Sequence, residues 1–113
     1  MSTVAYVVGA YRHKSWRTMA ANAEAAVEAG VKLTKRGYVA LIPHRAIGCM
    51  YGKISEAEAM TACYELIRRS DCVVVLPSWN QSRMSPKEID FARANKIPVW
   101  FGVENVPELS SNP

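Results

Sequence analysis

Four short apolar runs alternate along the chain with three segments of helical periodicity, and this alternation limits the folds available to it. The apolar runs occupy residues 4–8, 38–42, 72–76 and 97–101. Between them, apolar side chains recur at the spacing of one helix face over residues 15–36, 55–69 and 86–94. Strands and helices that alternate in this way predict a parallel sheet covered by helices on both faces.

The natural strand order for such a chain is 2-1-3-4. The expected fold class is α/β: a single-domain three-layer α/β/α Rossmann-like fold of the flavodoxin-like type. A chain of 113 residues suffices for one core, so residues 1–113 are assigned to one domain. Residues 103–113 are interpreted as a tail or an arm in an oligomer. Residues 45–54 are expected to form a loop, and Asn95 to be a left-handed helix cap.

This strand order places a crevice between the carboxyl ends of strands one and three. The segments that lead into the crevice are residues 9–14 and 78–88. Within the second segment, Ser85, Pro86 and Glu88 form the pattern of a helix start: an N-cap serine, a proline at the first helical position and a glutamate at the third. The sequence therefore delivers one carboxylate, Glu88, to the crevice.

Two interpretations of Glu88 follow. The partial positive charge of the helix start is expected to keep this carboxylate ionised. An ionised carboxylate can attack a sugar carbon and form a covalent glycosyl intermediate. The alternative is structural, because Glu88 also has the position that completes a capping box with Ser85.

The net charge of +4 is modest, and part of it gathers after the first strand in Arg12-His13-Lys14 and Arg17. This cluster is either a solvated basic surface or a site of attraction for phosphate or another small anion. The sequence contains no basic helix, finger or paired aromatic signature. We therefore expect no nucleic-acid partner.

Cysteine usage and hydropathy bound the class of protein. Cys49, Cys63 and Cys72 form no C-x-x-C pair and are expected to stay reduced. The histidines lack the spacing of zinc ligands, so we expect no metal and no other cofactor. No apolar run approaches the roughly 20 residues of a membrane span, and the first residues lack the features of a signal peptide. We expect a cytoplasmic protein without a membrane partner.

Several motifs also follow one another at a recognisable spacing. Residues 6–12, Tyr-Val-Val-Gly-Ala-Tyr-Arg, form a strand and a loop of the G-P-Y-R type. Trp79, Ser82 and Glu88 fit a W-x-x-S-x-G-x-x-x-E pattern. Together with segments 37–44, 63–75 and 92–99, these motifs resemble the nucleoside 2-deoxyribosyltransferase-like superfamily, especially its short bacterial and phage members. The resemblance covers nearly the whole domain.

This resemblance implies that Glu88 is a nucleophile that attacks the anomeric carbon of a nucleoside or nucleotide and releases the base. Ser82 would contact the sugar or phosphate, and Gly9 would allow close backbone approach beneath the ligand. Tyr11 would contact the sugar or stack on the base; otherwise it is a packing aromatic. Arg12 would pair with a 5′-phosphate; otherwise it is an exposed charge.

Three more residues near the crevice have double interpretations. His44 lies at the exit of strand two, where it would touch a base or serve as a polar packing residue. Trp79 would stack on a base or fill a subunit contact. Ser85 is counted with the substrate-binding residues as well as being a candidate cap. Because members of this superfamily commonly assemble as dimers or larger oligomers, a homo-oligomer is expected.

The chain departs from the family pattern at three positions. Met84 replaces a glycine two residues after the loop serine, and Ala10 replaces a common proline. Ala62 stands where family enzymes often carry an acidic residue that positions the sugar or assists protonation of the departing base. Glu58, one helical turn before Ala62, is the candidate catalytic replacement, or else the capping partner of Ser55.

The expected function is cleavage of the N-glycosidic bond of a nucleoside or nucleotide, or deoxyribosyl transfer, with Glu88 as nucleophile. The alternative is a non-catalytic module that binds a nucleotide or a nucleotide-derived signal in the same crevice. Ala62 and Met84 favour this alternative. A third possibility is an interaction protein that retains only the fold.

Overall fold

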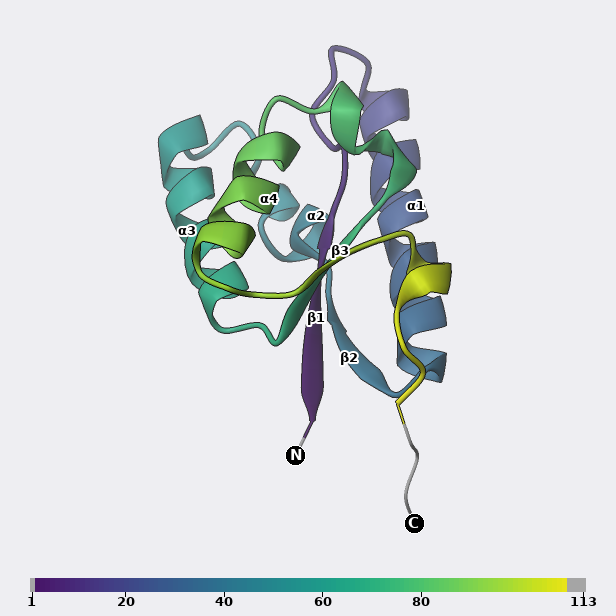
Figure 1. The fold of residues 1–113 in the computed structure, drawn as a ribbon. Helices are drawn as coiled ribbons and strands as arrows, with labels where there is room; N and C mark the ends of the chain where they lie inside the picture. The colour runs from purple at the N-terminus through teal and green to yellow at the C-terminus, as the bar shows by residue number, and fades with distance from the viewer. Residues whose placement is uncertain (1, 110–113) are drawn as a thin grey trace.

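The computed structural model describes residues 2–109, which form one parallel sheet with helices on both faces (Figure 1). The strand order is β2-β1-β3-β4, which confirms the predicted α/β class and topology. The strands are β1 (Thr3–Val8), β2 (Tyr38–Leu41), β3 (Cys72–Val75) and β4 (Val99–Phe101). The α-helices are α1 (Trp16–Lys35), α2 (Pro43–Ala46), α3 (Glu56–Arg68) and α4 (Ser85–Ala94), and the 3₁₀ turns are η1 (Gly48–Met50), η2 (Pro77–Gln81) and η3 (Val103–Asn105).

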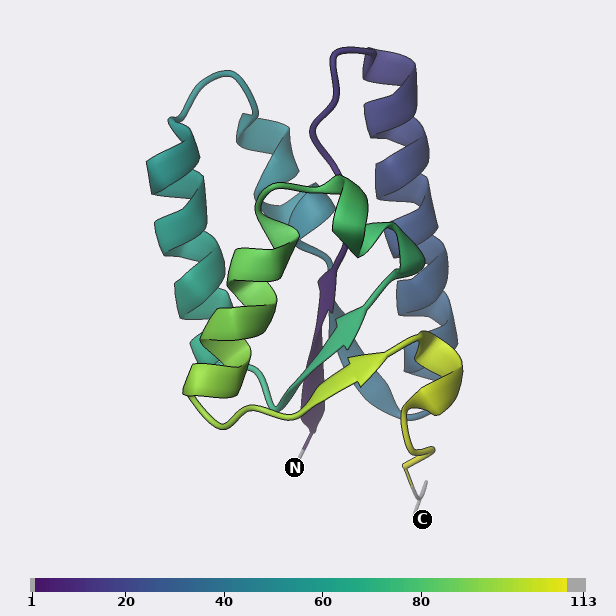
Figure 2. The same ribbon diagram turned by 45° about the horizontal axis from the view of Figure 1, so that its top comes forward.

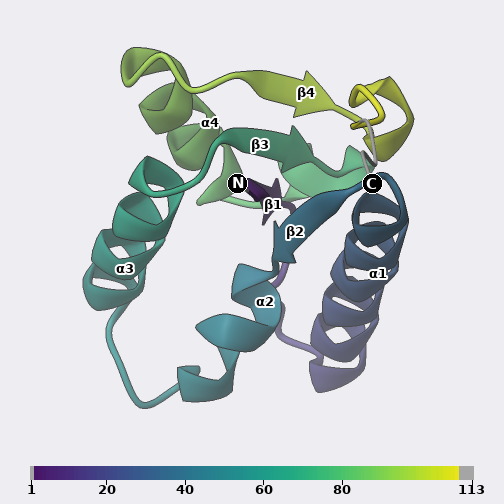
Figure 3. The same ribbon diagram turned by 90° about the horizontal axis from the view of Figure 1, so that it is seen from below.

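Side-chain alternation along β1 gives the sheet two apolar faces. Ala5 and Val7 pack on one face with residues of α1 such as Leu33. Tyr6 and Val8 pack on the other face with residues of α3 and α4. Figure 3 shows the same division, with α1 on one side of the sheet and α3 and α4 on the other. These three layers are those of the predicted Rossmann-like fold.

Two of the predicted helix starts are confirmed. The Ser15 side chain caps α1 by accepting a hydrogen bond from the Thr18 N–H. At α3, the Glu58 N–H donates to Ser55 Oγ over 3.0 Å, and the Ser55 N–H donates to Glu58 Oε1 over 2.8 Å. These two bonds between Ser55 and Glu58 form a complete capping box.

Two local predictions were wrong. Residues 45–54 do not form one loop, because α2 begins at Pro43, a residue whose fixed φ suits the first helical position, and η1 follows it. The left-handed residue after α4 is Lys96, with φ 59°, rather than Asn95, with φ −97°. Asn95 instead donates its side-chain amide to the Phe91 carbonyl oxygen over 2.8 Å.

Residues 103–109, which follow β4, pack on their own chain. Val103 and Val106 are buried in the apolar cluster that includes α1. The Tyr38 hydroxyl donates to the Pro107 carbonyl oxygen over 2.6 Å, and the Leu109 N–H donates to the Arg36 carbonyl oxygen over 2.9 Å. The prediction for residues 110–113 lies outside the described residues.

The carboxyl ends of β1 and β3 emerge at the same end of the molecule, as the parallel topology requires (Figure 2). The loop after β1 and the turn η2 both lie there. The Ala10 N–H donates to Ser78 Oγ over 3.0 Å, which ties these two segments together. None of the helices within residues 2–109 is long and apolar enough to span a bilayer.

Candidate functional site

A cavity of about 290 Å³ opens at this end of the sheet, where the strand order predicted a crevice. Its walls come from five parts of the chain: the end of β1 with the following loop, the region of α2 and η1, the first turns of α3, the loop before α4, and α4 itself. The lining residues are Val7, Gly9, Tyr11, Arg12, Pro43, His44, Ile47, Gly48, Tyr51, Ile54, Glu56, Ala59, Cys63, Gln81, Ser82, Arg83, Met84 and Glu88.

Glu88 lines this cavity, although only 6% of the residue is exposed to solvent. The Tyr6 hydroxyl, from the middle of β1, donates to Glu88 Oε2 over 2.5 Å. Burial raises the pKa of Glu88 to about 7, against hydrogen bonds from Tyr6 and Cys63 that lower it. The expectation that the helix start keeps this carboxylate fully ionised is therefore wrong, because desolvation outweighs the interactions that favour its charged form. Near neutral pH, both protonation states of Glu88 are populated.

The capping-box interpretation of Glu88 is also wrong. Helix α4 begins at Ser85 itself, so this serine is not the N-cap. Ser82 takes part of that role, since its Oγ accepts hydrogen bonds from the N–H groups of Met84 and Ser85, over 3.2 and 3.0 Å. Ser85 Oγ is buried and has no hydrogen-bond partner among the residues described. The Glu88 carboxylate is thus turned toward Tyr6 rather than toward the start of its own helix.

Cys63 and Tyr6 lie beside the carboxylate, and neither was predicted from the sequence to belong to the site. Burial raises the pKa of Cys63 to about 11, so its thiol stays protonated and can donate. Burial and the nearby Glu88 likewise raise the pKa of Tyr6 well above its usual value. A signal for Tyr6 was present in the sequence: a tyrosine within an otherwise aliphatic buried strand requires a partner for its hydroxyl.

Five predicted ligand-binding residues come together at the cavity: Gly9, Tyr11, Arg12, His44 and Ser82. The Tyr11 and His44 rings meet edge to face, with centroids 5.8 Å apart. Gly9 permits a close approach within the protein, since a Cβ there would lie 2.8 Å from Leu76 Cδ1. The Arg12 guanidinium lies over the ring of Tyr51, 5.0 Å from its centroid.

His44 is buried at the cavity wall and contacts the loop after β1. Its Nε2 lies 3.1 Å from the Gly9 carbonyl oxygen, and the residue is buried. Burial lowers the pKa of His44 below its ordinary value of 6.5, so the imidazole is neutral at pH 7. A neutral ring whose Nε2–H donates to Gly9 fixes the shape of the loop after β1.

Three predicted residues are not brought to the cavity. Trp79 packs against Phe101, with ring centroids 5.9 Å apart. Ser85 is enclosed at the start of α4. Glu58 is exposed and held in its capping box. The helix period explains its position, because α3 turns Glu56, Ala59 and Cys63 toward the cavity, whereas Glu58 and Ala62 lie on another face.

Glu56, a carboxylate that was not predicted from the sequence to belong to the site, lines the cavity instead. Arg83 holds it through two groups: Nη2 lies 2.7 Å from Oε1, and Nε lies 3.3 Å from Oε2. The hydrogen bond from Arg83 lowers the pKa of Glu56. Within residues 2–109, no group of three or more His, Cys, Asp or Glu side chains could hold a metal ion.

The match to a known family covers most of these residues. A family model described as a domain of unknown function, DUF4406, matches residues 17–101. This range includes His44, Glu56, Ser82, Arg83 and Glu88, whereas β1 and its loop precede it. No curated protein matches the chain. Because the family model spans well over half of the sequence, the chain belongs to the DUF4406 family.

Proposed function

We propose that this protein cleaves the N-glycosidic bond of a nucleoside or nucleotide, or transfers its deoxyribosyl group, with Glu88 as the nucleophile. The observation that carries the proposal is the placement of Glu88. Its carboxylate is buried at a cavity, bonded to Tyr6 over 2.5 Å, and free of any role in capping its helix. A desolvated carboxylate with a pKa of about 7 is a feature of functional sites more often than of surface helices.

The reaction would proceed in two steps. An oxygen of ionised Glu88 attacks the anomeric carbon, the bond between carbon and base nitrogen breaks, and its electron pair leaves with the base, which takes a proton from solvent. Water, or a nitrogen of a second base, then attacks the same carbon and releases Glu88. Tyr6 and Cys63 would hold the carboxylate in place and stabilise its charge as it departs from the sugar.

The walls of the cavity suit such a ligand. Its volume of about 290 Å³ is just below the range of roughly 300–1,000 Å³ that is usual for small-molecule sites. Tyr11 and Tyr51, which meet edge to face with centroids 6.3 Å apart, offer aromatic surface to a base. Ser82 and Gln81 offer polar groups to a sugar. The resemblance of the motifs around Ser82 and Glu88 to nucleoside 2-deoxyribosyltransferases supports the same class.

One observation favours a second candidate function, binding of a nucleotide without cleavage. Among the described lining residues, the carboxylates are Glu56 and Glu88, and Arg83 already holds Glu56. Helix α3 places the weakly acidic thiol of Cys63 beside Glu88. A cavity without a free second acid would lack the general acid that typically contributes about 10²–10⁴ in rate.

The test is chromatography of nucleosides and 5′-monophosphates incubated with the purified protein, with Glu88→Ala in parallel. Release of free base by the native chain and not by the variant would support the glycosidase. Mass spectrometry of the quenched protein would then locate a sugar ester on the peptide that contains Glu88. Intact substrates that bind measurably would favour the binding module, and base release by Glu88→Ala at the native rate would refute the assignment of Glu88.

A further inference from the structure

Cationic side chains gather near the entrance of the cavity: Arg12 and Arg83 line it, and Lys87 precedes Glu88 on α4. Glu56 is bonded to Arg83, and the charges of Arg83, Arg12 and Lys87 all lower the pKa of its carboxyl group. Three cations therefore act on one carboxylate. Within residues 2–109 the Arg12 guanidinium faces the Tyr51 ring and forms no ion pair. These cations would attract an anionic group of a ligand.

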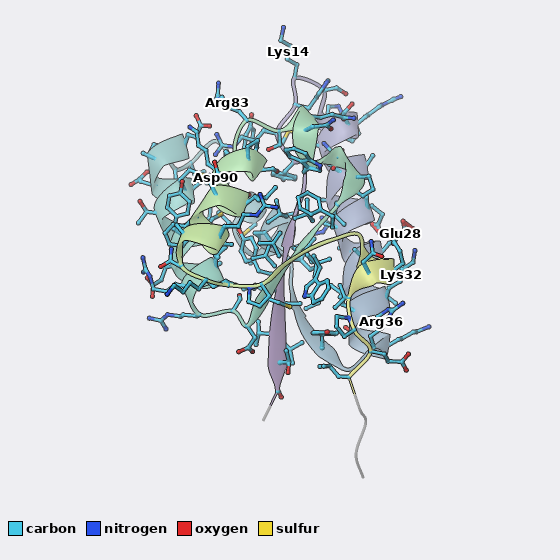
Figure 4. All side chains as sticks on the ribbon, viewed as in Figure 1. Lys14, Glu28, Lys32, Arg36, Arg83 and Asp90 are labelled. Carbon is cyan, nitrogen blue, oxygen red and sulfur yellow. The ribbon has the colours of Figure 1, made fainter. Side chains whose placement is uncertain are left out.

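The pair of Arg83 and Glu56 bridges two walls of the cavity. Glu56 is the first residue of α3, and Arg83 lies in the loop between η2 and α4. Both line the cavity. In Figure 4, Arg83 lies at the end of the molecule where the strands terminate, as does Lys14 of the basic loop after β1. The Arg83 side chain is 76% exposed, so its partner can be exchanged without unfolding its surroundings.

We propose that Arg83 binds the phosphate monoester of the ligand and that Glu56 is the internal counter-ion which this phosphate displaces. The inference rests on the proposed function and narrows its substrate class to nucleoside 5′-monophosphates. A guanidinium fork matches the oxygens of a phosphate as well as those of a carboxylate, so Arg83 exchanges one paired state for another. A phosphate monoester brings about −1.5 to −2 charges at pH 7, against one from Glu56.

Exchange is favoured because the existing pair is weak. Exposed ion pairs contribute little to stability, since water and salt screen them. The same helix supplies a control in Glu65, which is exposed, pairs with Arg69 at 2.8 Å and also with Arg68, and does not line the cavity. Glu65→Gln therefore tests whether the loss of a paired, exposed carboxylate from this helix is enough to change ligand affinity.

The experiment is calorimetric titration of the full chain with 2-deoxyribose 5-phosphate and with 2-deoxyribose. Neither probe contains an N-glycosidic bond, so binding is measured without turnover. We expect the phosphorylated sugar to bind more tightly to the native chain. Glu56→Gln should tighten its binding about two- to fivefold, because a competing carboxylate is removed. Arg83→Gln should weaken it by roughly tenfold or more. Glu65→Gln should change neither titration.

Equal affinity of the native chain for the two sugars would overturn the inference. So would the absence of binding of the phosphorylated sugar at millimolar concentration, or an unchanged affinity in both Glu56→Gln and Arg83→Gln. Failure of the proposed function has a different signature. If no base is released from any nucleotide, but phosphosugar binding still depends on Arg83, the glycosidase is refuted and the phosphate site stands.

Discussion

Helices α3 and α4 begin with the same four-residue pattern, Ser-x-x-Glu, and use it in opposite ways. At α3, Ser55 and Glu58 close a capping box at an exposed helix end. At α4, Ser85 is enclosed without a partner among the described residues, and Glu88 turns inward to Tyr6. The same pattern thus stabilises the start of α3, whereas at α4 it delivers a carboxylate to a cavity.

The difference arises outside the pattern. Upstream of α4, Ser82 already accepts hydrogen bonds from the first free N–H groups, so Ser85 becomes a helical residue. On the same face of the sheet, the Tyr6 hydroxyl offers Glu88 a donor that lies 82 positions away in the chain. A local motif predicts a helix start in both cases, but only the tertiary partner determines what its glutamate does.

The largest effect should come from exchanging each glutamate for glutamine. Glu88→Gln should lower base release on the order of 10⁴-fold, because an amide cannot act as the nucleophile. Glu58→Gln should leave the rate within about twofold, because this side chain lies outside the cavity. Initial rates measured chromatographically on the best substrate provide the check. A comparable loss in both variants would contradict the separation of roles and restore Glu58 as a catalytic candidate.

The sequence predicted what depends on local pattern and periodicity. The strand order, the capping box at Ser55 and the meeting of the loops around Tyr11 and Ser82 all followed from alternation and turn chemistry. It did not predict the bond between Tyr6 and Glu88 or the pair of Glu56 and Arg83, which join residues 82 and 27 positions apart. Such contacts depend on the exact angle at which helices lie on the sheet, and no local rule contains that angle.

The placement of Glu88 was predicted correctly, but its environment was not. Proximity to a helix start suggested an ionised carboxylate. The sequence shows how near Glu88 is to that start, but not that the side chain is withdrawn from water between β1 and α3. Burial sets the pKa, and burial is a property of the assembled layers.

The second prediction concerns stability and pH. Since the pKa of Glu88 is raised from its unfolded value of 4.5 to about 7, the folded state binds more protons than the unfolded state between these values. The contribution of Glu88 to the free energy of unfolding should be fully present below pH 4.5 and should be lost as the pH rises through 7. Above pH 7 the accumulated loss should reach roughly 3 kcal/mol relative to Glu88→Gln, whose amide does not titrate.

Urea unfolding of the native chain and Glu88→Gln at pH 4.5, 6 and 8 measures this difference. Glu58→Gln, the same substitution at a glutamate outside the cavity, is the control. A constant difference between the native chain and Glu88→Gln across this range would refute the raised pKa.

A smaller effect is expected from Tyr6→Phe, which removes one donor to Glu88 and keeps the buried ring. Because the Tyr6 hydrogen bond lowers the pKa of Glu88, its loss should raise that pKa further, by about one unit. If ionised Glu88 is the nucleophile, the acid limb of the rate profile should move to higher pH by the same amount. Tyr38→Phe, which removes a distant hydroxyl bonded to Pro107, should leave the profile in place.

The smallest effect compares the two serines directly. Ser55→Ala should destabilise the protein by about 1 kcal/mol, because the first turn of α3 loses its side-chain acceptor. Ser85→Ala should be neutral or slightly stabilising, because it removes a buried hydroxyl that lacks a partner among the described residues. Thermal unfolding of both variants at pH 6 provides the measurement. Equal destabilisation would mean that Ser85 Oγ does have a hydrogen-bond partner in solution, and the contrast between the two helix starts would then be confined to their glutamates.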